Sequence, residues 1–294
     1  MQTLMGYIGN WASVIRNVVW MYQNTSWSVF RRLISEHFIA WRLARQRLHE
    51  YNLLDDDELK RRKTSDRVFV FGSGASLNAI GDNGTYYLHK TPITYFVLRA
   101  GMESVEGNLA WRGDVDEIVS SIDGNRFLDK TVFHFQKGFT SIFCNRVLGF
   151  GFWKKERPLR LFFSDKVSRY PFMNSSNFLV HRAGTLCTAV SLAVSLGYKE
   201  IVLTGVDLYD NRYFWLPPDL TMGWDAQAQK WAPADKNFHG SSSAERHNTV
   251  RNGVVDILGD WQAHLAPAGI KLYAYNPRSL LTEKLPVFKW NTEA

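Results

Sequence analysis

The sequence predicts an α/β fold: a Rossmann-like, mostly parallel sheet with helices on both faces, a lid region and an N-terminal helical extension. Two observations predict it. Between residues 67 and 294, short apolar runs alternate with longer segments of helical periodicity, the pattern of strands and helices that build a parallel sheet. The first run, 68–71, leads at once into a glycine-containing turn, and a strand followed by such a turn and a helix opens many α/β domains.

Residues 1–66 are predicted to form a helical, basic and amphipathic extension. Between residues 27 and 48, large apolar residues recur at helical spacing and arginines fill most of the turns between them. Such a helix either packs on the rest of the protein or lies on an anionic membrane, and the sequence leaves both open. The acidic residues 55–57 are expected to begin a second short helix that ends in the basic run 60–63.

Residues 67–294 are predicted to form one Rossmann-like α/β domain. Its strands are expected at 68–71, 95–98, 131–135, 159–163, 201–204 and 270–275. Its clearest helices are expected at 184–196 and 249–264. The long polar and aromatic stretch at about 210–246 is predicted to be a lid or loop region beside an active site.

Composition narrows the class of protein and its location. The net charge of +7 favours an anionic partner. The 2 cysteines are too few for a disulfide framework and are predicted to be reduced core residues. There is neither an apolar run long enough to span a bilayer nor a secretory signal pattern. The protein is therefore expected in the cytoplasm, as a peripheral protein on the inner face of the cytoplasmic membrane if residues 27–63 bind lipid.

The first candidate for ligand binding is the turn that contains Gly72, Gly74 and Ser76. Glycines let the backbone approach a ligand, and the N–H groups of the helix that follows attract a phosphate. The turn lacks the third glycine and the acidic ribose ligand of the dinucleotide fingerprint. A tight strand–helix turn without a ligand is the alternative.

The second candidate runs from Arg182 to Tyr209. Residues 182–185 open a helix, the strand 201–204 follows, and the chain continues through Gly205 to Asp207 and Tyr209. The carboxyl end of a parallel strand is where α/β sheets bind ligands. A tyrosine hydroxyl is a neutral, rigid donor for a leaving phosphate. Asp207 is expected either to contact the ligand or to hold the loop.

Three segments resemble the bacterial sialyltransferases of glycosyltransferase family 42. The most specific is Leu-Gly-Tyr-Lys-Glu-Ile-Val-Leu-Thr-Gly-Val-Asp-Leu-Tyr at 196–209, within the run 182–209. Residues 68–80 resemble the opening strand and turn of that family, and residues 270–281 resemble its late strand and Pro-x-Ser-Leu segment. The resemblance covers about residues 67–285 and leaves residues 1–66 outside.

The resemblance implies a modified Rossmann domain with a lid, CMP-sialic acid as donor and no metal or other cofactor. Two tyrosines help the phosphate leave, and by position these are Tyr209 and, after a short gap, Tyr213; Trp215 takes the ungapped position. Arg182 and Thr185 match the family's arginine and small hydroxyl residue near the donor. The implied donor-binding residues are Gly72, Ser73, Gly74, Ser76, Thr185, Gly205 and Asp207, with Ser73 where the family has asparagine.

The same resemblance implies a histidine that deprotonates the acceptor hydroxyl. His247 is the first candidate and His239 is its rival in the same region. Two acidic groups resemble metal sites of other glycosyltransferases: residues 55–57, interpreted as a helix start, and the pair Asp207 and Asp210. A CMP leaving group has one phosphate, which tyrosines and helix dipoles stabilise without a cation, so no metal is expected.

The predicted function is therefore inverting transfer of a sialic acid or Kdo-like sugar from a CMP donor to a glycan or lipid-linked glycan of the bacterial surface. Two alternatives stay open: a flagellin-glycosylation accessory or pterin pyrophosphokinase-like enzyme of the same fold, and a membrane-associated nucleotide-binding scaffold without turnover. Nucleic acid is not expected as a partner, because the arginines accompany no nucleic-acid module. A homo-oligomer is left open.

Overall fold

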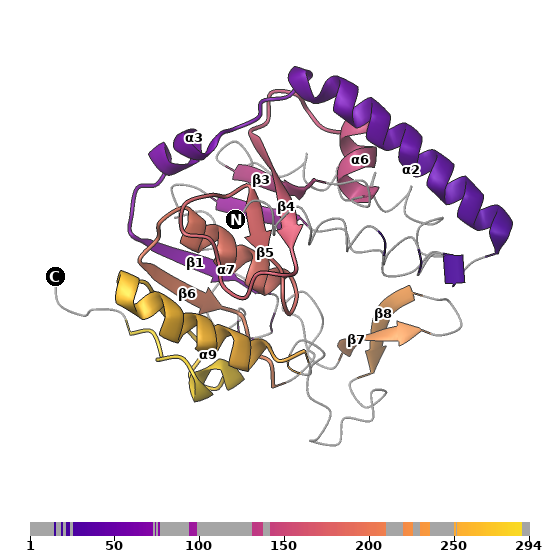
Figure 1. Ribbon diagram of the computed structural model, residues 1–294. Helices are drawn as coiled ribbons and strands as arrows, with labels where there is room; N and C mark the ends of the chain where they lie inside the picture. The colour runs from indigo at the N-terminus through magenta and orange to yellow at the C-terminus, as the bar shows by residue number, and fades with distance from the viewer. Residues whose placement is uncertain are drawn as a thin grey trace. The chain divides into compact units, whose positions relative to one another are not determined.

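The computed structural model, drawn in Figure 1, describes part of the chain. The described residues are 15, 19, 22–23, 26–72, 74, 76, 94–98, 131–137, 142–209, 220–225, 230–235, 250 and 252–289. The chain divides into two compact units. The first unit consists of Met1–Arg62, Pro92–Arg169 and Ser175–Val180, and the second of Lys63–Thr91, Tyr170–Asn174 and His181–Ala294.

The first unit is built on a parallel sheet of four strands in the order β2-β3-β4-β5. The strands are β2 (Thr94–Leu98), β3 (Thr131–Gln136), β4 (Leu159–Asp165) and β5 (Phe178–Val180). The helices are α2 (Trp27–Arg47), α3 (Asp56–Arg61) and α6 (Ile142–Gly149), with a short 3₁₀ turn η1 (Leu48–Glu50) after α2. Phe135 pairs with Leu161 across β3 and β4, and Asp165 pairs with Val180 across β4 and β5.

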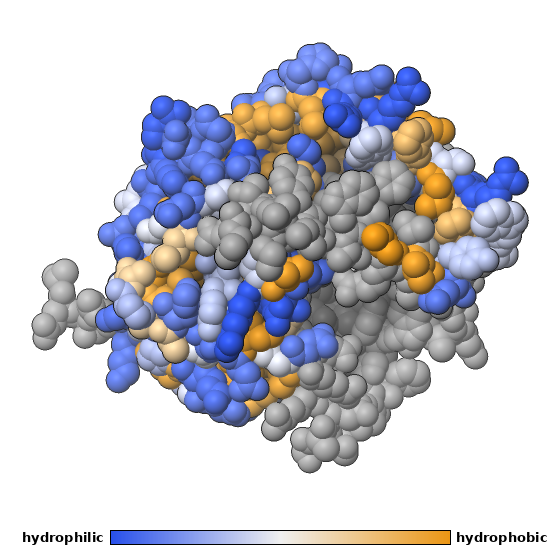
Figure 2. All heavy atoms as spheres, in the orientation of Figure 1, coloured by the Kyte–Doolittle hydropathy of each residue, from blue (hydrophilic) through white to orange (hydrophobic). Residues whose placement is uncertain are grey.

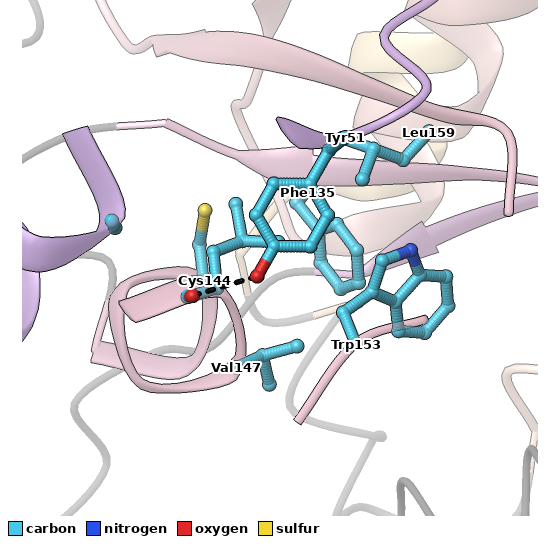
Figure 3. Close-up of a cluster of buried hydrophobic side chains, with 8 residues drawn as sticks. Tyr51, Phe135, Cys144, Val147, Trp153 and Leu159 are labelled. Carbon is cyan, nitrogen blue, oxygen red and sulfur yellow. Dashed lines mark hydrogen bonds between the residues drawn. The ribbon is translucent and has the colours of Figure 1, made fainter. Parts of the chain in front are cut away.

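Aromatic side chains fill the core of this unit, shown in Figure 3. Phe135 of β3 meets Trp153 edge to face, with ring centroids 5.1 Å apart. The hydroxyl of Tyr51 donates a hydrogen bond of 2.8 Å to the carbonyl of Leu148 on α6, so the buried phenol is satisfied. Burial raises the pKa of Cys144 in this cluster to about 12. Both cysteines are free and buried, as predicted.

The helix predicted between residues 27 and 48 is confirmed as α2, and one of its faces packs on α6. His37, Ala40 and Ala44 are buried there. The helices approach so closely that a Cβ at Gly149 would lie 2.4 Å from the carbonyl oxygen of Ala40. The sequence set residues 1–66 apart as an extension, whereas the structure groups residues 1–62 in one compact unit with residues 92–169.

The acidic residues 55–57 begin a helix, as predicted. The Asp55 carboxylate caps α3 by accepting a hydrogen bond of 2.7 Å from the backbone N–H of Glu58. Asp56 forms an ion pair of 2.8 Å with Arg160. These carboxylates are therefore engaged in the fold, and the described residues contain no cluster of metal-ligating side chains.

The second unit is built on a parallel sheet of three strands in the order β1-β6-β9. The strands are β1 (Arg67–Phe71), β6 (Glu200–Thr204) and β9 (Lys271–Ala274). The helices are α7 (Thr185–Ser195) and α9 (Val254–Leu265), with the 3₁₀ turns η5 (Ala266–Ala268) and η6 (Leu280–Glu283). An antiparallel pair, β7 (Leu220–Asp225) and β8 (Lys230–Asp235), completes the described elements.

The α/β class and the parallel pairing are confirmed, but the arrangement of strands differs from the prediction. One mostly parallel sheet was expected, whereas the described parallel strands form two sheets, one in each unit. The stretch predicted as a lid at about 210–246 contains β7 and β8, and the rest of it lies outside the described residues. No described helix combines the length and the apolar character needed to cross a bilayer.

Candidate functional site

The loop after β1 and the loop after β6 cross in contact at the carboxyl edge of the three-stranded sheet. The backbone N–H of Gly72 donates to the carbonyl of Thr204, and the N–H of Gly74 donates to the carbonyl of Gly205, each at 2.7 Å. A Cβ at Gly72 would lie 2.4 Å from the carbonyl oxygen of Gly205. Glycine is therefore required at this turn by the crossing itself, which accounts for part of the glycine pattern without a ligand.

Asp207 ties this crossing to the loop after β9. Its side chain is only 3% exposed. One carboxylate oxygen accepts a hydrogen bond of 2.8 Å from the backbone N–H of Ser76, and the other accepts one of 2.9 Å from the side-chain amide of Asn276. Of the two roles expected for Asp207, the structure supports that of holding the loops. Asp210, its partner in the metal site considered from the sequence, lies outside the described residues.

The loop after β9 contributes residues that the sequence did not single out. The amide of Asn276 also approaches the hydroxyl of Tyr209, at 3.4 Å. The hydroxyl of Ser279 donates a hydrogen bond of 2.5 Å to the carbonyl of Val206. Asn276 and Ser279 lie in the segment 270–281, whose Asn-Pro-Arg-Ser sequence was the available signal. Ser279 therefore holds the backbone just before Asp207, and Asn276 contacts the side chains of Asp207 and Tyr209.

Tyr209 and Arg278 lie together at this edge. The guanidinium carbon of Arg278 is 5.2 Å from the centroid of the Tyr209 ring. The backbone N–H of Arg278 donates a hydrogen bond of 3.0 Å to the side-chain oxygen of Asn276. This bond fixes the backbone just before Arg278. Arg278 is exposed and forms no ion pair within the described part of the chain. The pair therefore presents an uncommitted cation next to a phenol, and such a pair suits an oxyanion.

Arg182 and Thr185 lie at the start of α7, where both are exposed. Gly184, with φ 109°, precedes the first turn and provides no side-chain cap. A short turn joins the end of α7 to β6, and α7 packs on β1. The helix therefore runs antiparallel to the strands, and its N-terminus points toward their carboxyl edge. Its free N–H groups are available to an anion.

Two buried hydroxyls near the crossing have no hydrogen-bond partner among the described residues, those of Ser76 and Thr204. Thr204 is 1% exposed and ends the central strand β6. Buried polar atoms are usually satisfied, so each of these hydroxyls has the capacity to bind a polar atom of a ligand or a water molecule.

The structure brings together Gly72, Gly74, Ser76, Gly205, Asp207 and Tyr209 from the predicted site. It places Arg182 and Thr185 at the N-terminal end of α7. Ser73, Asp210, Tyr213, Trp215, His239 and His247 lie outside the described residues. The donor side of the predicted site is therefore partly described, and the predicted base is not.

Gly74→Ala is expected to lower the free energy of unfolding by about 1–3 kcal/mol, because an inserted methyl group must displace its neighbours. The added Cβ would lie 2.5 Å from a carboxylate oxygen of Asp207. Denaturant unfolding of Gly74→Ala, Asp207→Ala and the double variant measures the coupling between the two positions. We expect Gly74→Ala to lower the free energy of unfolding by less when residue 207 is already alanine. Strictly additive costs would contradict this contact.

The fold and the edge geometry define the class of this protein as an α/β protein with parallel sheets, in which loops from three strands meet at one carboxyl edge. Comparison with protein-family models, with curated proteins and with solved structures finds no significant match.

Proposed function

We propose that this protein is an inverting glycosyltransferase that transfers a sialic acid or Kdo-like sugar from a CMP donor to a glycan or lipid-linked glycan. One observation carries the proposal: Tyr209 and Arg278 lie together at the carboxyl edge of the sheet, on loops joined through Asn276 and Asp207. A phenol and a guanidinium match the oxyanions of a phosphate or of an acid sugar. The resemblance of residues 182–209 to the sialyltransferases supplies the identity of the nucleotide.

The donor nucleotide is proposed to lie over the crossing of the first two loops. Gly72 and Gly74 allow the two loops to pack in direct contact below the nucleotide, and the buried hydroxyls of Ser76 and Thr204, which have no partner among the described residues, have the capacity to bind polar atoms of the ligand. The N-terminus of α7, with Arg182 and Thr185, attracts a negative charge approaching the same edge. The exposed guanidinium of Arg278, over the ring of Tyr209, adds a cation there.

The reaction breaks the bond between the anomeric carbon of the sugar and the phosphate oxygen of CMP. Tyr209 donates a hydrogen bond to the departing phosphate, and Tyr213 is the proposed second donor. The acceptor hydroxyl attacks the opposite face of the anomeric carbon while His247 takes its proton. The configuration at the anomeric carbon is thereby inverted, and CMP leaves with the charge that these donors stabilise. The proposal requires no metal.

CMP is expected to stabilise the native protein selectively. At a concentration 100 times its dissociation constant, a ligand of the folded state adds about 2.7 kcal/mol to the free energy of unfolding. Thermal unfolding with CMP, UMP, GDP and ATP in separate samples, each with and without EDTA, measures this. We expect a shift with CMP that EDTA leaves unchanged and small shifts with the other nucleotides.

A matched pair of variants shows whether the shift arises at this edge. Arg278→Gln is expected to weaken the stabilisation by CMP, whereas Lys271→Gln, an exposed charge at the other end of β9, is expected to leave it intact. Equal shifts with all four nucleotides favour the scaffold alternative. A shift confined to GDP or ATP, or one abolished by EDTA, contradicts the metal-independent CMP reaction.

A further inference from the structure

Helix α2 has two contrasting faces. Its buried face packs on α6 through His37, Ala40 and Ala44, which are spaced by three and four residues. Two polar contacts accompany this packing: Glu36 forms an ion pair of 2.9 Å with Arg146, and Asn145 lies 3.4 Å from His37. The side of α2 that belongs to the core of the first unit is therefore defined, and the other side is left to solvent or to a partner.

The outward face of α2 exposes large apolar side chains among arginines. Trp27 is 61% exposed and Phe38 is 48% exposed. Trp27, Arg31, Phe38, Arg42 and Arg45 follow one another at spacings of four, seven, four and three residues. Residues at such spacings lie on one side of a helix. The outward face is thus an aromatic stripe with arginines inserted in it, and Ile39, 51% exposed, borders it.

The same character continues at the N-terminal end of α2. Ile15, Val19 and Tyr22, which precede α2 in the chain, are exposed. The ring of Tyr22 meets that of Trp27 edge to face, with centroids 6.2 Å apart. Figure 2 shows hydrophobic and hydrophilic side chains interleaved along α2, at the upper right of the view. Apolar exposure is therefore found both on α2 and at described residues that precede it in the chain.

The charged residues of α2 are predominantly positive. Its sequence holds arginines at 31, 32, 42, 45 and 47, and a single acidic residue, Glu36. Glu36 is already paired with Arg32 and Arg146. Arg31 and Arg42 are exposed and form no ion pair within the described residues. The outward face therefore carries positive charge that no carboxylate among these residues neutralises.

We propose that the outward face of α2 binds an anionic lipid surface, with the helix lying parallel to the membrane. A helix of 21 residues spans about 30 Å, enough to place its aromatic stripe in the headgroup region along its length. Trp and Phe favour the interface between water and lipid, and arginine stems extend along apolar surface while their guanidinium groups reach the phosphates. A nucleic-acid backbone matches the charge but leaves Phe38 and Ile39 exposed. This inference does not depend on the proposed glycosyl transfer.

Vesicle co-sedimentation tests the inference directly. The native chain is expected to bind phosphatidylcholine vesicles that contain phosphatidylglycerol and to leave pure phosphatidylcholine vesicles unbound. Arg31→Gln with Arg42→Gln is expected to weaken the partition coefficient about 25-fold, at about 5-fold for each basic residue. The matched control, Lys271→Gln with Lys289→Gln, removes two exposed charges from the second unit and is expected to change it little. High salt should reverse the binding.

A second variant tests the contribution of apolar side chains to vesicle binding. Phe38→Gln with Ile39→Gln keeps the charge and is also expected to reduce binding, because it removes side chains that enter the headgroup region. Circular dichroism and thermal unfolding check that α2 stays folded in every variant. Three results would overturn the inference: no binding of the native chain to anionic vesicles, equal losses in the two charge variants, or a dimer in sedimentation velocity that Phe38→Gln with Ile39→Gln dissociates.

Discussion

Asp207→Ala is expected to lower the free energy of unfolding by about 3 kcal/mol and to abolish the stabilisation by CMP. The carboxylate is 3% exposed and accepts hydrogen bonds from the N–H of Ser76 and the amide of Asn276. Its removal takes the carboxylate acceptor away from both of these partly buried donors. Asn276 then loses the bond that orients it under Tyr209, so the donor edge loses its geometry as well. Denaturant unfolding and CMP thermal shifts measure the two effects.

Asp256 provides the matched control for this prediction. Its side chain is 83% exposed and its ion pair with Lys284 is 3.7 Å long. Asp256→Ala is expected to change stability by less than about 0.5 kcal/mol and to leave CMP binding intact. Asp207→Asn keeps the shape of the side chain and one carbonyl acceptor. We therefore expect its loss of free energy of unfolding to fall between those of Asp207→Ala and Asp256→Ala. If Asp207→Ala were as mild as Asp256→Ala, Asp207 would not hold these loops.

Local signals in the sequence predicted most of the elements that build this edge. Apolar runs located β1, β6 and β9 to within one or two residues, because a buried parallel strand reads as a continuous apolar run. The same reasoning placed Asp207 and Tyr209 at the carboxyl end of β6. The short strand β5, three residues long, was missed because so few residues show no periodicity. Helix α6 was missed as well, since it is only eight residues long and residues 144–149 are all buried, the polar Asn145 and Arg146 included.

The same local signals could not predict how segments distant in the sequence pair and pack. Whether β1 pairs with β6 or with β2 depends on packing between distant segments. The apolar runs themselves therefore do not indicate that the strands divide into two sheets. Asn276 lies 69 residues from Asp207 in sequence, and only the fold joins their side chains. For α2 the periodicity predicted the helix, but apolar residues occur on two of its sides. The choice of His37, Ala40 and Ala44 as the buried face required the structure.

His247→Ala is expected to slow the release of CMP from CMP-sialic acid or CMP-Kdo about 10²–10⁴-fold, the usual contribution of a general base. His247 lies outside the described residues, and its role is carried over from the resemblance. Stabilisation by CMP is expected to remain, because the base acts on the acceptor hydroxyl or on water and makes no contact with the nucleotide. In the native protein the rate should rise with pH through about 6.5, as the imidazole becomes neutral. This rise should be missing in the variant.

The rival histidine provides the control. His239→Ala is expected to keep both the rate and its pH dependence, so the two variants differ only in which imidazole is lost. Added imidazole should restore part of the rate in His247→Ala, since a free base can enter the space left by the side chain. Turnover close to native in His247→Ala would remove it from the mechanism, and loss of rate in His239→Ala alone would transfer the role to that residue. Retained CMP binding with lost turnover would separate the base from the donor edge, because Tyr209, Arg278 and Asp207 are unchanged in this variant.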